Sequence, residues 1–167
     1  NIYNRMIGKQ RDQKKILNKR AQWLNEYIKL VFINKNYPGF QNFLIKDIKS
    51  AYCEIYDNDK EDYITQKKDD VLNQVLGMSI NDLTDMINMH KENIGKTTNK
   101  MAKKSSDKYI KEYNDENSKF IKEKTKDIEL MLYNGRETVN ETVNLVKHEK
   151  IKLRPKKRKL VPKIINQ

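Results

Sequence analysis

Apolar residues near the start of the chain recur with the spacing of a helix. They stand four, three, four and three positions apart, at Leu17, Ala21, Leu24, Ile28 and Val31. This spacing places them along one helical face. The pair Pro38 and Gly39 follows, and such a pair is typical of the end of a helix. We therefore predict a first helix over residues 3–35.

The same spacing continues after the Pro-Gly pair. A second helix is predicted over residues 40–56, with one apolar face made of Phe40, Leu44, Ile48, Ala51 and Ile55. A third helical segment is predicted over residues 62–76, where Val71, Leu72, Val75 and Leu76 are apolar. Between the two lies an acidic stretch at residues 57–62, which we interpret as an exposed loop.

The segment Gly77-Met78-Ser79 predicts a break between two helices. Ser79 followed by Asp82 resembles a capping box with Asp in place of Glu. A further helix would then begin near residue 80 and end near Gly95. The two helices around the break resemble a helix-turn-helix, whose second helix enters the major groove of DNA. Asp82 and Asp85 would then face phosphates, so we favour a packed hairpin and keep a DNA-binding regulator as an alternative.

The last predicted helices are more polar. Residues 98–133 are highly charged with sparse apolar positions, and we predict one long helix packed on a single side. The pair Asn134-Gly135 predicts its end. A short helix over residues 137–144 would bury Val139, Val143 and Val146. Pro155 and Pro162 exclude a regular helix beyond residue 147, where we expect an extended tail.

These patterns predict an all-α fold of about five helices, including one long charged helix, with an extended basic C-terminal tail. The chain has only five glycines and three prolines in 167 residues, which agrees with few turns. We divide it into a basic N-terminal helix at 1–36, a slightly acidic helical region at 37–146 and the tail at 147–167.

Positive charge is concentrated at the two ends of the chain. The net charge is +12, and the tail contributes +8 of it from nine basic residues and one acidic residue. The middle region has 17 basic and 20 acidic residues, so it is slightly negative. Like charges this close repel one another, and a polyanionic partner, most often nucleic acid, explains such a run.

The candidate nucleic-acid-binding residues follow from this distribution. We expect them to bind RNA or DNA through the phosphate backbone, without a visible base-reading device. Tyr109, Tyr113 and Tyr133 are the aromatic residues most available for stacking on bases. The candidate basic residues are Lys14, Lys15, Lys19, Arg20, Lys147, Lys150, Lys152, Arg154, Lys156, Lys157, Arg158, Lys159 and Lys163.

Catalytic and metal-binding patterns are missing from the sequence. His90 and His148 lie far apart, and Cys53 is the single cysteine, so no pair has metal-ligand spacing. The acidic loop lacks the central Gly and the final Glu of a calcium-binding loop. Gly95-Lys96-Thr97 lacks the earlier glycine of a phosphate-binding loop. We therefore predict no enzyme, no metal, no cofactor and no small-molecule substrate.

The sequence gives only broad indications of the cellular location. A lone cysteine excludes an internal disulfide framework, and no apolar run reaches the length of about 18 residues that a membrane span needs. Arg5 and Lys9 interrupt any signal-peptide pattern. We expect a setting inside a cell or a particle, without membrane binding and without secretion as a disulfide-stabilised domain.

The functional hypothesis is a non-enzymatic structural or accessory component of a large nucleic-acid-containing assembly, such as a ribosome-like particle or a virion. The basic ends would contact the polyanion, and the helices would contact neighbouring proteins. Two alternatives stay open at this point. One is a helical protein–protein adaptor without nucleic acid, and the other is the DNA-binding regulator described above.

Overall fold

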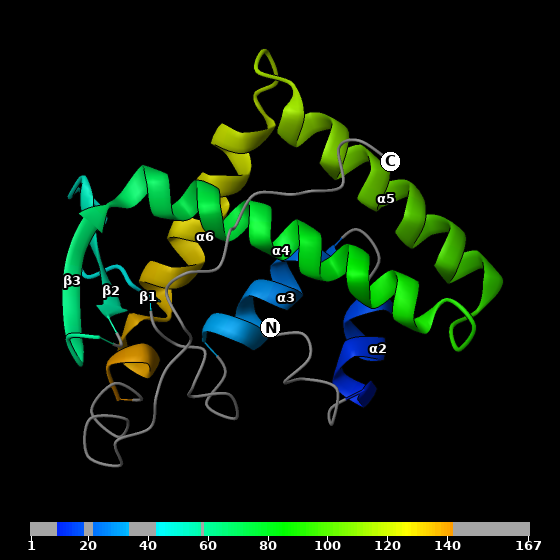
Figure 1. The fold of residues 1–167 in the computed structure, drawn as a ribbon, viewed down its shortest axis with the longest axis horizontal. Coiled ribbons are helices and arrows are strands. Elements are labelled where there is room, and N and C mark those ends of the chain that lie inside the picture. Colours follow the sequence, from blue (N-terminus) through cyan, green and yellow to red (C-terminus); the bar gives the residue numbers. More distant parts are fainter. Residues whose placement is uncertain (1–9, 19–21, 34–42, 58, 142–167) are drawn as a thin grey trace.

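The computed structural model describes residues 10–18, 22–33, 43–57 and 59–141. Figure 1 labels the elements of this part of the chain. The helices are α2 (Gln10–Asn18), α3 (Trp23–Phe32), α4 (Lys68–His90), α5 (Lys96–Asn114) and α6 (Phe120–Asn134). The strands are β1 (Phe43–Leu44), β2 (Tyr52–Asp57) and β3 (Asp62–Lys67). A short helical stretch at residues 136–141 follows α6.

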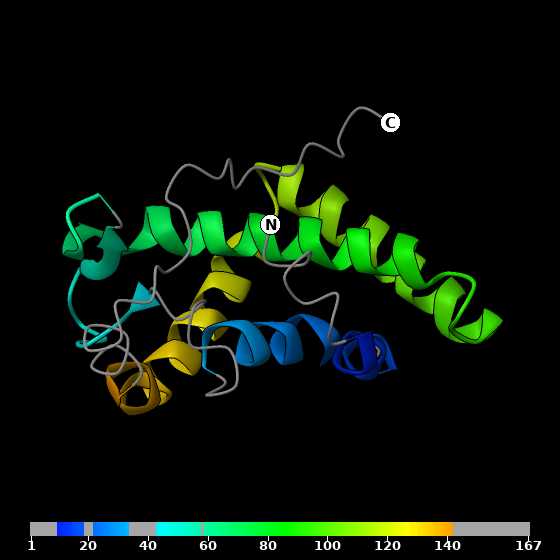
Figure 2. The ribbon, with the colours of Figure 1, turned by 60° about the horizontal axis from the view of Figure 1, so that its bottom comes forward.

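Helix α4 is the centre of the fold. It contacts α2, α3, α5 and α6 as well as strands β2 and β3 (Figure 1). Helices α2 and α3 lie against one side of it and α5 runs along another, as the turned view of Figure 2 also shows. Large side chains from these elements are fully buried and form the main core: Leu17, Trp23, Leu24, Tyr27, Ile28, Phe32, Ile45, Leu72, Leu76 and Met78.

The first predicted helix is confirmed in part. Leu17, Leu24, Ile28 and Val31 are all buried, as the helical spacing predicts. They belong to two helices, α2 and α3, and residues 19–21 between them lie outside the described part of the chain, as do 1–9 and 34–42. Two amphipathic helices supply the face that we assigned to one.

The prediction of a purely α-helical fold was wrong. The protein is rich in helix, but it also contains a three-stranded antiparallel sheet in the order β1-β2-β3. Ile55 pairs with Phe43 on one side and with Ile64 on the other. The run from Tyr52 to Tyr56 mixes aromatic and β-branched residues, which favour strands, and we misread its apolar positions as a helical face.

The predicted break at residues 77–79 was also wrong, because α4 continues through it. The Ser79 hydroxyl donates to the carbonyl of Val75 at 2.7 Å within the helix, so it caps no new one. Asp82, which we placed on an exposed face, is fully buried and accepts a hydrogen bond from the Tyr27 hydroxyl. One continuous helix cannot form a helix-turn-helix, so the DNA-binding-regulator alternative loses its structural basis.

The predicted long helix over 98–133 is divided into α5 and α6. At the division, Asp115 Oδ1 accepts the backbone N–H of Asn117 at 3.0 Å, and Ser118 Oγ accepts the N–H of Phe120 at 3.1 Å. Such local bonds compete with the helical hydrogen-bond ladder and favour turns and helix starts. The chain therefore turns sharply here, and α6 packs against α4.

Two glycines mark helix boundaries. Gly95 is the N-cap of α5 rather than the end of the preceding helix. The predicted end at Gly135 is confirmed, since its N–H donates to the carbonyl of Met131 at 3.0 Å. A Cβ at Gly135 would lie 2.8 Å from Cγ2 of Ile33, so a larger residue would have to displace the Ile33 side chain. Val139 beyond it is buried as predicted, whereas Val143 and Val146 lie outside the described residues.

Candidate nucleic-acid interface

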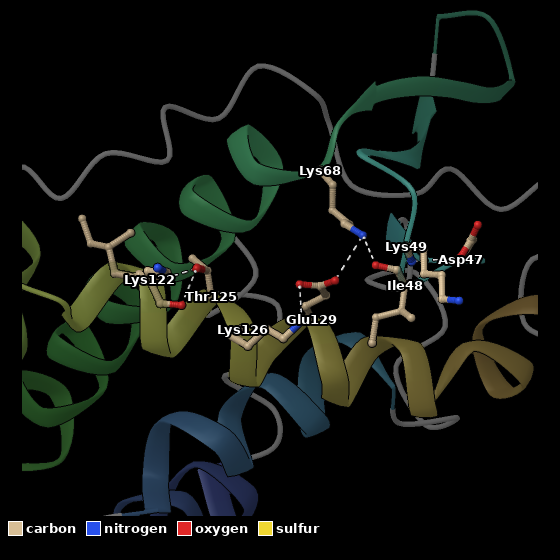
Figure 3. A network of polar contacts seen from close by, with 9 residues as sticks. Asp47, Ile48, Lys49, Lys68, Lys122, Thr125, Lys126 and Glu129 are labelled. Atoms are coloured by element: carbon tan, nitrogen blue, oxygen red, sulfur yellow. Dashed lines mark hydrogen bonds and ion pairs between the residues drawn. The ribbon is translucent and has the colours of Figure 1, made fainter.

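The buried charges of the protein are engaged in structural contacts. Lys68 Nζ lies 3.1 Å from Glu129 Oε1 and donates to the carbonyl of Ile48 at 2.9 Å (Figure 3). The backbone N–H of Lys68 also donates to Ala51 at 2.9 Å. This ion pair joins the start of α4 to α6 and to the loop before β2. Its ammonium group is therefore not available to a ligand.

Cys53 lies on β2 and is 4 % exposed. Burial raises the pKa of its thiol from 9.0 to about 12, although the nearby charge of Lys68 opposes part of the rise. A thiol with such a pKa stays protonated at neutral pH, and only the thiolate is a strong nucleophile. The side chain acts as a small apolar residue of the core.

His90 closes the end of α4 against α2. Its Nε2 lies 2.6 Å from Oε1 of Gln13, to which it donates a hydrogen bond, and the side chain is 1 % exposed. Burial lowers the pKa of His90 from 6.5, and the positive charge of Lys14 lowers it further. The ring is therefore neutral at neutral pH. Across the described ranges, no three His, Cys, Asp or Glu side chains are grouped so that they could hold a metal ion.

The outer face of α5 differs from these buried sites. The helix carries six lysines and two acidic residues, and all six lysines are exposed. At about 100° per residue they fall within an arc of about 140° around the helix. We call this surface the α5 lysine face. It consists of Lys96, Lys100, Lys103, Lys104, Lys108 and Lys111.

The lysines of this face are not neutralised by neighbouring carboxylates. Within the described part of the chain, ion pairs occur on other elements, and none involves a lysine of α5. Asp107 lies in the middle of the face by helical position, yet it forms no ion pair with Lys103 or Lys111. The face therefore presents unpaired positive charge to solvent.

The opposite side of α5 holds the helix in place. Ala102 and Ser106 are buried, and the Ser106 hydroxyl lies 2.7 Å from the Thr84 hydroxyl of α4. The Tyr109 ring stacks on Trp23 with centroids 5.9 Å apart. The Tyr113 hydroxyl donates to Oδ1 of Asn73 at 2.9 Å. These contacts fix the rotation of α5, so its lysines must point away from the core.

The same contacts correct our expectation for the tyrosines. Tyr109 and Tyr113 are half-buried and face the core, and Tyr109 also packs against Phe120. Tyr133 is half-buried with the Arg136 guanidinium 4.0 Å from its ring centroid. None of the three is a freely exposed ring on which a base could stack.

Only some of the predicted basic residues lie within the described part of the chain. Lys15 on α2 is exposed, and Lys14 is half-buried near His90. Lys19, Arg20 and the whole predicted tail, 147–167, lie outside the described residues. Our sequence reasoning missed the α5 lysine face, because α5 was averaged into a region with a small negative charge. A narrower window would have found it, since its lysines recur every three or four positions.

Negative charge gathers at a different place. The tip of the β2–β3 hairpin, including the last residue of β2 and the first of β3, carries Asp57, Asp59, Glu61 and Asp62 with a single lysine, Lys60. Figures 1 and 2 place this hairpin at one end of α4 and the start of α5 at the other end. The described part of the molecule is therefore acidic at the sheet end and basic along α5.

A groove of about 710 Å³ lies between α4 and α5 beside the lysine face. Ile87 and Ile110 supply its apolar part, and Lys103, Asp107 and Asp115 are among its charged residues. It is open to solvent and mixed in polarity, so it has neither the enclosure nor the apolar lining of a typical small-molecule site.

Comparisons with known proteins add no evidence on the function of this chain. No protein-family model, no curated protein and no solved structure matches the chain. Among the described helices, none has both the length and the apolar character needed to cross a membrane.

Proposed function

We propose that this protein is a non-enzymatic accessory component of a nucleic-acid-containing assembly, which it contacts through the phosphate backbone. The observation that carries this proposal is the α5 lysine face, with six exposed lysines and no ion pair among the described residues. Folding does not require such a surface, since like charges at helical spacing repel. A phosphate backbone neutralises it and releases counterions.

The terminal sequences add to the same proposal. The tail supplies a net +8, and Lys15 adds an exposed charge on α2. The basic regions are therefore separate along the chain, with α5 between the two basic ends. Several separate contacts with one polyanion would act together and strengthen binding.

The buried polar groups support a non-catalytic role. Lys68 is paired with Glu129, the Cys53 thiol has a raised pKa, and His90 is hydrogen-bonded to Gln13. The ion pair of Lys68 and the hydrogen bond of His90 each join two helices, and Cys53 is packed in the core. A catalytic site would instead place perturbed groups together in a cleft.

The proposal is tested by fluorescence anisotropy with labelled nucleic acid from about 50 to 300 mM salt. The full chain is compared with a chain that ends at Val146. We expect tight binding by the full chain, a steep loss with salt, and weaker but measurable binding by the shortened chain through α5. Absence of binding by the full chain at 50 mM salt would refute the proposal.

A helical protein–protein adaptor is the second candidate. The groove between α4 and α5 favours it, together with Met101 and Leu130, which are 41 % and 40 % exposed. An adaptor predicts no nucleic-acid binding in the experiment above.

A further inference from the structure

The α5 lysine face is a band of lysines along one helix whose orientation is fixed. From Lys96 to Lys111 the helix rises about 22 Å at about 1.5 Å per residue. Packing of Ser106, Tyr109 and Tyr113 against α3, α4 and α6 holds the helix at a fixed rotation. The lysine side chains are long and flexible, but their anchoring points are fixed.

The face also carries no aromatic ring and no arginine. The two tyrosines of α5 face the core, and the amide of Asn114 donates to the carbonyl of Ile110 at 2.8 Å. The helix contains no arginine, which is the commonest side chain in specific contacts with guanine. The charged groups of the face are six ammonium groups and the carboxylate of Asp107, and the ammonium groups bind phosphates without regard to sequence.

We infer that the α5 lysine face binds the sugar-phosphate backbone of double-helical nucleic acid without reading its sequence. This inference rests on the proposed function and adds the class of nucleic acid. A duplex holds its phosphates in fixed positions and carries about one charge per 1.7 Å of its axis. Lysines anchored on a fixed helix can contact it without ordering a flexible strand. Proteins that bind single strands use aromatic stacking platforms, which this face does not have.

An anionic membrane surface is the competing polyanion. Helices that bind at membrane surfaces place an apolar face among the lipids. The apolar side of α5 is occupied by α4 and α3, and Met101 is the exposed large apolar residue of this helix in the described structure. A duplex therefore fits the face better than a lipid surface.

The test uses the full chain and two sextuple variants with the same change in net charge. In the first, all six lysines of the α5 lysine face become glutamine, which keeps a high helix propensity. In the second, six exposed lysines outside α5 become glutamine, and none of these has an ion pair in the described structure. The control positions are Lys49, Lys60, Lys67, Lys91, Lys119 and Lys122.

Anisotropy is measured with a 24-base-pair DNA duplex, an RNA duplex, a single strand of the same length and anionic vesicles. For at least one duplex, the α5 variant is expected to lose at least about 10-fold in affinity at 100 mM salt. Its salt slope should fall by up to about 5, since each of up to six neutralised phosphates contributes about 0.9. The control variant should lose less than about 3-fold, and two duplexes of different sequence should bind within about 2-fold.

Each other outcome has a distinct meaning. If both variants weaken duplex binding equally, the α5 interface is refuted while the proposed function stands. If the single strand or the vesicles bind more tightly than either duplex and depend more on α5, the inferred partner class is wrong. If the unmodified chain binds neither duplexes nor single strands at 50 mM salt, the proposed function itself fails.

Discussion

Helices α3 and α5 both pack on α4, but they use their residues in opposite ways. In α3, six of 10 residues are buried, and in α5 two of 19 are buried. Both Trp23 and Tyr27 of α3 belong to the main core, whereas α5 contributes Ala102 from its buried positions. Most residues of α3 therefore serve core packing, whereas most residues of α5 are not buried and can carry charged side chains.

This difference separates residues that stabilise the fold from exposed charged residues that the fold does not require. Burial of apolar area stabilises a domain by about 25 cal/mol per Å², and α3 supplies much of that area. An exposed lysine adds little to folding, and a row of them is slightly unfavourable.

The largest effect is expected at the packed helix. Ile28 is fully buried in α3, so Ile28→Ala should lower the free energy of unfolding by about 2–5 kcal/mol through a cavity in the core. Urea unfolding followed by the fluorescence of Trp23, the single tryptophan, measures it. A loss below about 1 kcal/mol would mean that α3 is less tightly packed than its burial indicates.

The next effect concerns the ion pair between α4 and α6. Lys68→Met leaves the carboxylate of Glu129 in a site where its side chain is 11 % exposed, with Lys126 at 3.7 Å as the remaining partner. We expect a loss of about 3 kcal/mol, at the lower end for a broken buried pair. Lys126→Met is the matched control and should cost less than about 1 kcal/mol. Equal losses in the two variants would contradict the structural role of Lys68.

A smaller, pH-dependent effect is expected at His90. Burial and Lys14 lower its pKa from 6.5 in the folded protein, so the unfolded chain binds a proton at higher pH than the folded one. The contribution to stability is complete above about pH 6.5 and is lost as the pH falls toward the folded pKa. Urea titrations at several pH values should show this loss in the wild type and a smaller one in His90→Gln. Parallel pH profiles would contradict the assignment.

The smallest effect on stability is expected from the α5 lysine face. Replacing its six lysines with glutamine removes several like-charge pairs at helical spacing, each worth about 0.2–0.5 kcal/mol. The variant should be as stable as the wild type or more stable by about 1 kcal/mol in the same urea assay. A loss of more than about 1 kcal/mol would show that these lysines serve the fold.

The sequence predicted the packed part of the molecule better than its strands. The spacing of Leu17, Leu24, Ile28 and Val31 identified a face that is buried as expected. The apolar residues around Ile55 satisfied a helical template, but they pair across a sheet with Phe43 and Ile64. A short apolar run fits both periods, and long-range pairing decides between them.

The helix boundaries show how tertiary contacts and local polar contacts override simple signals. Gly77 and Ser79 are typical of a break between helices. However, α4 stays helical at these positions because the tertiary packing of Leu76, Met78 and Ile80 stabilises it. Conversely, no glycine marks the division between α5 and α6. There the side chains of Asp115 and Ser118 make the turn. We also missed the α5 lysine face in the sequence. A net charge summed over a whole region does not show that the lysines lie together on one side of a helix.

The central claim is that α5 uses its exposed lysines for binding, and lysine footprinting tests it most directly. The full chain is acetylated with and without a saturating duplex, and each lysine is quantified by mass spectrometry. The account predicts strong protection of Lys96, Lys100, Lys104 and Lys108, with Lys49 and Lys60 modified equally in both samples. Equal modification of the α5 lysines with and without the bound duplex would contradict it.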